Sequence, residues 1–273
     1  MVFKYENIKL NYEVIGDGIP IVIIHGLSCS RELMIGCMEP ILKEYKGYKR
    51  IYVDLPGMGR SSAELNYAVS DKILEVLLAF INHEVSGNFL LVGQSYGGYL
   101  ARGILSVIPN RVDGLFLLCP VVISDKNKRK LPIRNVESFD ESFFENISEK
   151  EKGGFLEYAA VADEYTYMRY KNEIEIGLNT ANQEFIDKLC ENYEFGFDAD
   201  KKINENKFIK PTLFIAGRQD DVVGYHNLFE IFESYPRAAY YILDLAGHNL
   251  QIEQPQMFES LVHDWLKRVS VYL

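Results

Sequence analysis

A single serine stands between glycines in residues 93–98, which read GQSYGG. A short apolar run precedes this stretch and a helical pattern follows it, so the glycines mark the point where a strand turns into a helix. A serine held in such a turn projects its hydroxyl group outward, which suits a nucleophile. The pattern G-x-S-x-G is specific for this role when a strand precedes it and a helix follows it. Ser95 is therefore the candidate nucleophile, with Gly93 and Gly97 shaping its turn; an incidental serine in a glycine-rich turn is the alternative.

A serine hydroxyl is a weak nucleophile without a neighbouring base, and histidine is the usual base. Three of the five histidines stand in helical patterns among polar neighbours and are expected at the solvated surface: His83, His226 and His263. His25 ends an apolar run and precedes Gly26. His248 follows another strand-like run, at the carboxyl end of the predicted sheet, which is the edge where Ser95 is expected. We therefore predict that His248 is the general base; a loop histidine without a partner is the alternative.

A catalytic imidazole needs a carboxylate on its second nitrogen, which fixes its tautomer and stabilises its charged form. Asp220 and Asp221 both follow the run PTLFIAG, again at the carboxyl end of a predicted strand. An aspartate pair near glycine in a loop is ordinarily a turn device, but this loop should neighbour the loop of His248. We choose Asp220 as the acid, with Asp221 second and Asp125, which follows the preceding strand, third.

Acyl transfer places negative charge on the carbonyl oxygen, so preorganised N–H donors are needed to stabilise it. One donor is expected to be the backbone N–H of Tyr96, the residue after the nucleophile. The second is expected from the loop HGLSCS that follows residues 19–24, with the N–H of Leu27 as the candidate. His25 and Gly26 would then shape this loop without titrating in the reaction. This chemistry needs neither a metal ion nor an organic cofactor.

The elements that must position these residues are read from the apolar pattern. Residues 2–15 alternate as a hairpin around Glu6 and Asn7. Continuous apolar runs, typical of strands buried on both faces, occupy residues 19–24, 50–53, 89–92, 115–119, 212–216 and 240–245. Amphipathic helical patterns stand at residues 73–81, 228–235 and 258–266. Buried strands that alternate with amphipathic helices predict an α/β fold with a mostly parallel central sheet covered by helices on both faces.

Residues 123–207 break this alternation, because they are charged at their start, rich in aromatic residues further on, and without a convincing buried strand. A structureless loop of this length is uncommon in a compact domain. We predict a mostly helical cap, or lid, inserted into a core domain formed by residues 1–122 and 208–273. The insertion leaves from the carboxyl end of a strand, where it could roof the site. Its aromatic residues predict an apolar substrate pocket, with a small core of the insertion's own as the alternative for any one of them.

The composition excludes several classes of protein. The chain has 273 residues, a net charge of −10 and a pI near 5.1, which argues against a nucleic-acid partner and against binding to an anionic membrane. No run reaches the roughly 18 apolar residues of a membrane span, and the first residues do not read as a signal peptide. The four cysteines lack the spacing of a zinc site or a disulfide framework: Cys29, Cys37, Cys119 and Cys190. We therefore expect a cytoplasmic protein, and the sequence leaves open a homo-oligomer.

Five motifs together resemble the α/β-hydrolase fold superfamily, in the branch with a serine nucleophile and an inserted cap. They are HG at 25–26, DLPGMGRS at 54–61, GQSYGG at 93–98, GRQD at 217–220 and AGHNLQIEQP at 246–255. Position by position, the resemblance implies Ser95 as the nucleophile, His248 as the base and Asp220 as the acid. Leu27 and Tyr96 are the implied oxyanion donors. The serine argues against the dehalogenase and epoxide-hydrolase branches, which use a carboxylate nucleophile.

These residues predict a serine hydrolase of the carboxylesterase type, which cleaves a small apolar ester or related acyl compound through an acyl-enzyme. The same three side chains can serve other reactions on this fold: cofactor-free haloperoxidase or perhydrolase chemistry, C–C bond hydrolysis, a lyase reaction, and thioesterase or aminopeptidase activity. A ligand-binding protein on the same scaffold, with slow or no turnover, is a further hypothesis of a different class.

Overall fold

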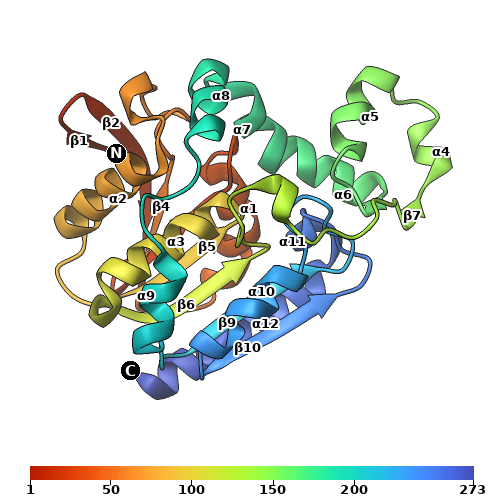
Figure 1. Cartoon of the computed structure of the whole chain (residues 1–273). Helices are drawn as coiled ribbons and strands as arrows, with labels where there is room; N and C mark the ends of the chain where they lie inside the picture. Colours follow the sequence, from red (N-terminus) through yellow and green to blue (C-terminus); the bar gives the residue numbers. More distant parts are fainter.

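A computed structural model describes all 273 residues and contains an eight-stranded sheet in the order β1-β2-β4-β3-β5-β6-β9-β10 (Figure 1). The strands of this sheet are Val2–Tyr5 (β1), Ile8–Ile15 (β2), Ile19–Ile24 (β3), Tyr48–Val53 (β4), Phe89–Gln94 (β5), Val112–Leu118 (β6), Thr212–Gly217 (β9) and Ala238–Leu243 (β10). β2 pairs antiparallel with β1 and with β4, and the other neighbours are parallel. The predicted mostly parallel sheet is therefore confirmed.

Each central strand coincides with one of the predicted apolar runs, because a strand that is buried on both faces needs apolar residues along its whole length. All residues of β5, β6 and β9 are buried, and only the first two residues of β3 are not. The parallel register places Ile24 of β3 beside Gly93 of β5, and Gln94 of β5 beside Leu118 of β6. The carboxyl ends of these strands therefore lie together along one edge of the sheet.

Helices cover both faces of the sheet, as predicted (Figure 1). The helical elements outside residues 123–207 are Arg31–Leu42 (α1), Leu65–Tyr67 (η1), Ser70–Glu84 (α2), Tyr96–Val107 (α3), Pro109–Arg111 (η2), His226–Ile231 (α10), Phe232–Ser234 (η5), Leu250–Glu253 (α11) and Pro255–Tyr272 (α12). α1 packs against α12 on one face, and α2 packs against α3 on the other. Under α12, the fully buried Trp265 contacts Phe116 of β6, which also contacts Phe258.

Residues 123–207 are mostly helical and lie between β6 and β9. Their elements are Lys126–Lys128 (η3), Ser138–Phe139 (β7), Glu141–Phe144 (α4), Glu149–Leu156 (α5), Val161–Ala162 (β8), Glu164–Arg169 (α6), Tyr170–Ile174 (η4, a π-helical turn), Glu175–Thr180 (α7), Gln183–Glu191 (α8) and Ala199–Asn206 (α9). α4, α5 and α6 project to the side of the sheet, whereas α9 runs along α3 (Figure 1). The last part of this segment therefore belongs to the helical layer that covers the sheet.

Most of the aromatic residues in this segment pack against one another. Phe144 stacks on Phe139 and Phe155, and its edge meets Tyr167. This cluster forms a small core for the projecting helices, so these aromatic side chains do not line the space above the sheet.

None of the helices has both the length and the apolar sequence that crossing a bilayer would require.

Candidate active site

Ser95 occupies a sharp turn between β5 and α3. Its φ of 52° lies in the left-handed region, which a residue with a β-carbon adopts at a cost of about 1–3 kcal/mol and which recurs at functional sites. Two backbone hydrogen bonds hold the turn: the Ser95 N–H donates to the Leu118 carbonyl at 3.0 Å, and the Ser95 carbonyl accepts from the Val121 N–H at 3.0 Å. The strained serine is thus fixed by the end of the neighbouring strand β6.

Gly93 and Gly97 allow this turn to form because no β-carbon fits at either position. A β-carbon on Gly93 would overlap the carbonyl of Gly97, and one on Gly97 would overlap the carbonyl of Ile24 at the end of β3. The two glycines let the start of α3 pack directly against the ends of β3 and β5.

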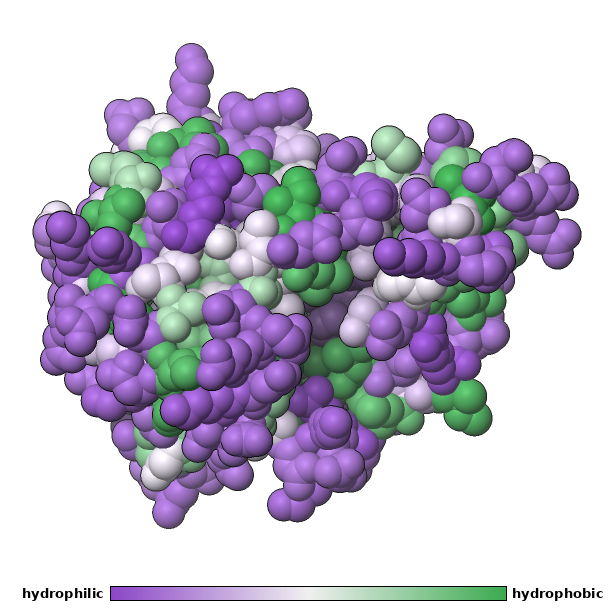
Figure 2. Space-filling model, turned by 90° about the horizontal axis from the view of Figure 1, so that it is seen from above, coloured by the Kyte–Doolittle hydropathy of each residue, from purple (hydrophilic) through white to green (hydrophobic).

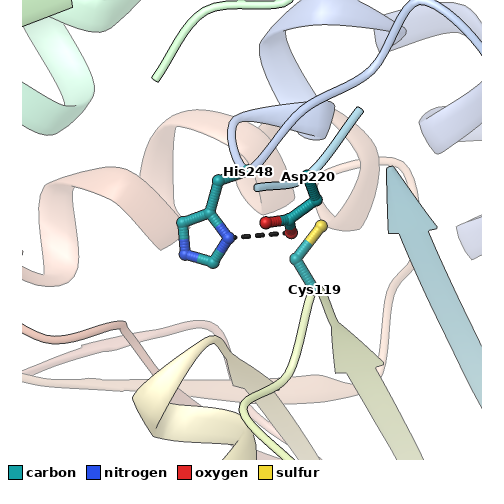
Figure 3. A group of neighbouring side chains, drawn as sticks. All are labelled: Cys119, Asp220 and His248. Atoms are coloured by element: carbon teal, nitrogen blue, oxygen red, sulfur yellow. Dashed lines mark hydrogen bonds and ion pairs between the residues drawn. The ribbon is translucent and has the colours of Figure 1, made fainter. Parts of the chain in front are cut away.

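His248 lies between Ser95 and Asp220 and bonds to both. Its Nε2 is 2.9 Å from the Ser95 Oγ, and its Nδ1 is 2.9 Å from the Asp220 Oδ2. Figure 3 shows the imidazole edge turned toward the carboxylate. A carboxylate only accepts, so Nδ1 carries the proton and Nε2 accepts from the serine hydroxyl. The structure therefore brings together three side chains that follow three different strands.

Asp220, and not Asp221, faces the imidazole. The Asp220 side chain is fully buried, and its Oδ1 accepts from the backbone N–H groups of Val222 at 3.0 Å and Val223 at 2.9 Å. The Asp221 carboxylate lies 3.9 Å from the Arg134 Nε, and burial raises the pKa of Asp221.

Asp125, the third candidate for the acid, has a different partner. It is the N-cap of the η3 turn and accepts from the Asn127 N–H at 3.0 Å.

Cys119 lies beside this hydrogen-bonded pair. It follows β6 with a φ of 40°, and its sulfur points toward the Asp220 carboxylate (Figure 3). The ligand atoms of Cys119, Asp220 and His248 lie within 4.8 Å of one another, so these residues are the candidates for holding a metal ion. Burial and the charge of Asp220 raise the pKa of the Cys119 thiol well above its ordinary value. Metal binding here would require loss of that thiol proton and rupture of the bond between Asp220 and His248.

The loop after β3 lies on the other side of Ser95. His25 is fully buried; its Nδ1 is 2.7 Å from the Gly26 carbonyl oxygen, and its Nε2 accepts from the Leu55 N–H at 3.0 Å. Burial lowers the pKa of His25, which favours this neutral form. The loop brings Leu27 to the wall of the cavity that contains Ser95. Tyr96 begins α3, where the first backbone N–H groups of a helix have no partner within the helix.

The remaining histidines lie outside this group. His83 and His226 are exposed, as predicted. His263 also lies at the surface, but its side chain is only partly exposed and its Nδ1 bonds to the Tyr45 hydroxyl at 2.6 Å. The pattern of α12 places His263 on the border between its apolar and polar faces, where a neighbouring tyrosine covers it.

Ser95 and His248 open into a cavity of about 580 Å³, within the size range of small-molecule sites. Half of its 22 lining residues come from the segment 123–207. The apolar group of lining residues, called the apolar side, comes from the loop after β3, α1, η4 and α7: Leu27, Cys29, Leu33, Ile174 and Leu178. The polar group, called the polar side, comes from residues 124–129 and the end of α8: Ser124, Asp125, Lys126, Asn127, Arg129, Cys190 and Glu191. Seen from above, the surface is hollowed between the main body and the projecting part, with hydrophobic residues beside the hollow (Figure 2).

The lining differs from the sequence prediction. Of the many aromatic residues in the segment 123–207, Tyr158 and Tyr193 line the cavity. Ile174 lies on a π-helical turn, for which the sequence offered no signal. The polar residues 124–129 were visible as a charged run, but a charged run is ordinarily a solvated surface.

Known proteins with similar sequences share this fold. The family profile of the alpha/beta hydrolase fold matches residues 19–255. The crystal structure of an alpha/beta superfamily hydrolase from Oenococcus oeni PSU-1 is 32% identical in sequence, has a TM-score of 0.89 and covers 99% of both chains. A 2-hydroxymuconate semialdehyde hydrolase of Pseudomonas sp. strain CF600 is 26% identical over 269 residues, with 95% of this chain and 90% of the relative covered. A pimeloyl-(acyl-carrier protein) methyl ester esterase of Legionella pneumophila is 22% identical over 255 residues, with 92% and 97% covered. The match over most of the chain shows that this protein is a hydrolase of the α/β-hydrolase fold family.

Proposed function

We propose that this protein is a serine hydrolase that cleaves an ester or a related acyl compound through an acyl-enzyme. The observation that carries the proposal is the pair of 2.9 Å hydrogen bonds that link Asp220 through His248 to Ser95 in the wall of the cavity. A nucleophile bonded to a base that is itself oriented by a carboxylate is the arrangement that activates a serine hydroxyl.

In the first half of the reaction, the Ser95 Oγ attacks the substrate carbonyl carbon while His248 Nε2 takes the hydroxyl proton. The resulting imidazolium lies against the Asp220 carboxylate, which stabilises its charge. When the tetrahedral intermediate collapses, the bond to the leaving alcohol breaks and His248 gives its proton to that alcohol. The product of this half is an acyl-enzyme on Ser95 and a free alcohol.

In the second half, a water molecule takes the place of the alcohol. His248 removes a proton from this water, and the hydroxide attacks the acyl carbon. Collapse of the second intermediate breaks the bond to Ser95 Oγ, which regains its proton from His248. The carboxylic acid leaves, and each half of the reaction uses only these side chains, backbone donors and water.

The negative charge on the substrate oxygen would be stabilised by the backbone N–H groups of Leu27 and Tyr96. In support, Leu27 lines the cavity next to Ser95, and Tyr96 supplies an N–H at the positive end of α3. The bonds that His25 makes to the Gly26 carbonyl and the Leu55 N–H would fix the loop that presents Leu27.

The two sides of the cavity suit a substrate with one apolar arm and one polar arm. Leu33, Ile174 and Leu178 would contact the apolar arm, and the residues 124–129 would contact the polar arm. The segment 123–207 would act as the cap over this substrate, because half of the lining residues belong to it.

The test compares the purified wild type with Ser95→Ala, using p-nitrophenyl butyrate as the substrate and a fluorophosphonate as the probe. Ser106→Ala is the matched control, because Ser106 lies on α3 but bonds only to the Gly103 carbonyl. We expect the wild type and Ser106→Ala to turn over the ester and to be labelled. Ser95→Ala should lose at least about four orders of magnitude in kcat and all labelling. Equal activity in the wild type and Ser95→Ala would reject the proposal.

Hydrolysis of a carbon–carbon bond next to a carbonyl group is the second candidate. It is favoured by the similarity to the 2-hydroxymuconate semialdehyde hydrolase and by the positively charged Lys126 and Arg129 in the polar side of the cavity. Loss of the absorbance of 2-hydroxymuconate semialdehyde, measured beside turnover of p-nitrophenyl butyrate, separates the two candidates. Turnover of the ester without turnover of the semialdehyde would support the first candidate, ester hydrolysis, and reject the second.

A further inference from the structure

A second buried carboxylate lies next to the loop of His248. Glu253 ends α11 and is 7% exposed. Its Oε2 accepts from the Gly247 N–H at 2.6 Å, and its Oε1 accepts from the Ala160 N–H at 2.6 Å and the Val161 N–H at 3.3 Å. No lysine or arginine forms an ion pair with it.

The groups that Glu253 joins belong to two different parts of the molecule. Gly247 immediately precedes His248, whereas Ala160 and Val161 belong to the projecting segment, at β8. The contact between the two parts is close, because a β-carbon on Gly247 would lie 3.2 Å from the Tyr158 carbonyl oxygen. One side chain therefore connects the loop of the base with the segment that roofs the cavity.

A second contact links the same two parts. Arg169, at the end of α6, donates to the Gln251 carbonyl of α11 at 3.4 Å and to the Gly36 carbonyl of α1 at 3.3 Å. The helix that directly follows His248 is thus bound to the projecting segment both at Gln251 and at Glu253.

Burying a carboxylate without a neighbouring cation costs desolvation free energy. An apolar side chain of similar volume would avoid this cost. Burial raises the pKa of Glu253 to about 7. The carboxylate has two oxygens that accept hydrogen bonds. One accepts from the loop of His248 and the other accepts from two N–H groups of the projecting segment. A glutamine offers one oxygen and one NH2 group, so it leaves at least one of these donors facing another donor.

We propose that Glu253 is a positioning residue, which fixes His248 against Ser95 and makes that position depend on how the projecting segment is seated. This inference rests on the proposed function, because it assigns Glu253 to the same reaction. Glu253 itself does not touch the reacting atoms. It acts through the Gly247 N–H on the backbone that carries the base.

The test uses Glu253→Gln, which removes one acceptor, and Glu253→Asp, which keeps the charge but is too short to reach both sides. Glu39→Gln is the matched control, because Glu39 bonds to Arg50 and Tyr52 between α1 and β4. We measure kcat and KM for p-nitrophenyl butyrate, and the rate of fluorophosphonate labelling, in variants whose circular dichroism matches the wild type. Both Glu253 variants should lose about 10- to 100-fold in kcat and in labelling rate, with KM changed less than about threefold. Glu39→Gln should stay within about threefold of the wild type.

Hydrogen exchange provides a measurement that does not depend on activity. In Glu253→Gln the amides of Gly247 and of residues 160–161 should exchange faster together, whereas a purely local role would change one side only. Wild-type kcat and labelling in either Glu253 variant, or exchange that changes on one side only, would overturn the inference. If Glu253→Gln does not fold, the test uses kcat and labelling of Glu253→Asp together with exchange of these amides in the wild type. The inference then requires reduced kcat in Glu253→Asp and protected amides on both sides in the wild type. A wild type that is not labelled at all would instead reject the proposed function.

Discussion

Replacement of Asp220 by asparagine should stop His248 from accepting the proton of Ser95 while leaving the fold intact. The Oδ1 atom of Asp220 accepts from the N–H groups of Val222 and Val223, and the Oδ2 atom faces the Nδ1 of His248. In Asp220→Asn the two backbone donors hold the amide oxygen, so the NH2 group must point at the imidazole. Nδ1 then accepts, and the proton moves to Nε2, where it faces the hydroxyl of Ser95. The serine loses its acceptor although no heavy atom has moved.

The expected loss in kcat is about four orders of magnitude, the size known for the same exchange in another Ser-His-Asp triad. This loss corresponds to about 5 kcal/mol of transition-state stabilisation. Asp221→Asn is the matched control, because the neighbouring carboxylate has only a long contact with Arg134, at 3.9 Å. Long or exposed ion pairs contribute at most about 1 kcal/mol, so Asp221→Asn should keep kcat within about fivefold.

The assay measures kcat and KM with p-nitrophenyl butyrate, the unfolding midpoint, and fluorophosphonate labelling for the three proteins. Asp220→Asn should keep a wild-type circular dichroism spectrum and a KM within about threefold. If Asp220→Asn retains more than a tenth of kcat, the assigned tautomer is wrong. If Asp221→Asn shows the large loss instead, the acid has been assigned to the wrong residue of the pair.

Three further predictions follow from the cavity and from Glu253. Ile174→Trp should fill the apolar side and lower kcat/KM for p-nitrophenyl decanoate relative to the acetate by at least about tenfold. Cys190 is exposed at the surface, but partial desolvation of its sulfur raises the pKa of the thiol. A maleimide should therefore inactivate the enzyme faster at pH 9 than at pH 7, and Cys190→Ser should resist. Burial also raises the pKa of Glu253 from 4.5 to about 7, so the folded state holds this proton more tightly than the unfolded chain. The free energy of unfolding that this tighter proton binding contributes is fully present below pH 4.5. It is lost as the pH rises through 7. In urea unfolding, the wild type should therefore lose about 3 kcal/mol relative to Glu253→Gln between pH 4.5 and 8.5; a pH-independent difference would contradict this.

The central strands could be predicted because burial on both faces leaves a continuous apolar run. The run at Ile19–Ile24 has the same bounds in the structure. The strand predicted at residues 240–245 instead runs over Ala238–Leu243, and Leu245 has a φ of 51°. An apolar pattern does not report a left-handed residue, so it continues past the end of the strand.

The helical pattern at residues 228–235 shows a second limit of periodicity. The structure has α10 over His226–Ile231, followed by the 3₁₀ turn Phe232–Ser234. Over so short a span, apolar residues three and four positions apart do not distinguish an α-helical turn from a 3₁₀ turn, which repeats every three residues. For the same reason, the pattern gave no sign of the π-helical turn at Tyr170–Ile174.

Ser95 and His248 could be predicted from their positions after strands, but the choice of the acid had less support. Asp220 and Asp221 are adjacent in one loop, and they differ in burial and in the backbone donors that surround them, which only the folded loop defines. Glu253 was not recognised as a site residue, because it stands beside Gln251 and Gln254 in the stretch LQIEQP, where an acid is ordinarily solvated. The spacing of the cysteines gave no reason to connect Cys119 with the site, and the structure places its sulfur beside Asp220.

The sheet alone does not bring His248 to Ser95. Ser95 follows β5, Asp220 follows β9 and His248 follows β10, and the sheet order β5-β6-β9-β10 separates the first strand from the last by three steps. Neighbouring strands lie about 4.8 Å apart, so these strand ends are roughly 14 Å apart. The loop of His248 must therefore reach back across two strands to bring Nε2 within 2.9 Å of the serine.

Because this loop has left the sheet, strand pairing no longer holds it. Other contacts must do so: Ala246 accepts from the Gln219 N–H at 2.9 Å and donates to the Gln219 side chain at 3.1 Å, and Gly247 donates to Glu253. Gln219 anchors the loop to the end of β9, whereas Glu253 anchors it to residues 160–161 of the segment that supplies half of the cavity lining. Loss of the bond from Gly247 to Glu253 removes the backbone contact next to His248, which is why the position of the imidazole should respond to a residue that contacts neither Ser95 nor the His248 side chain.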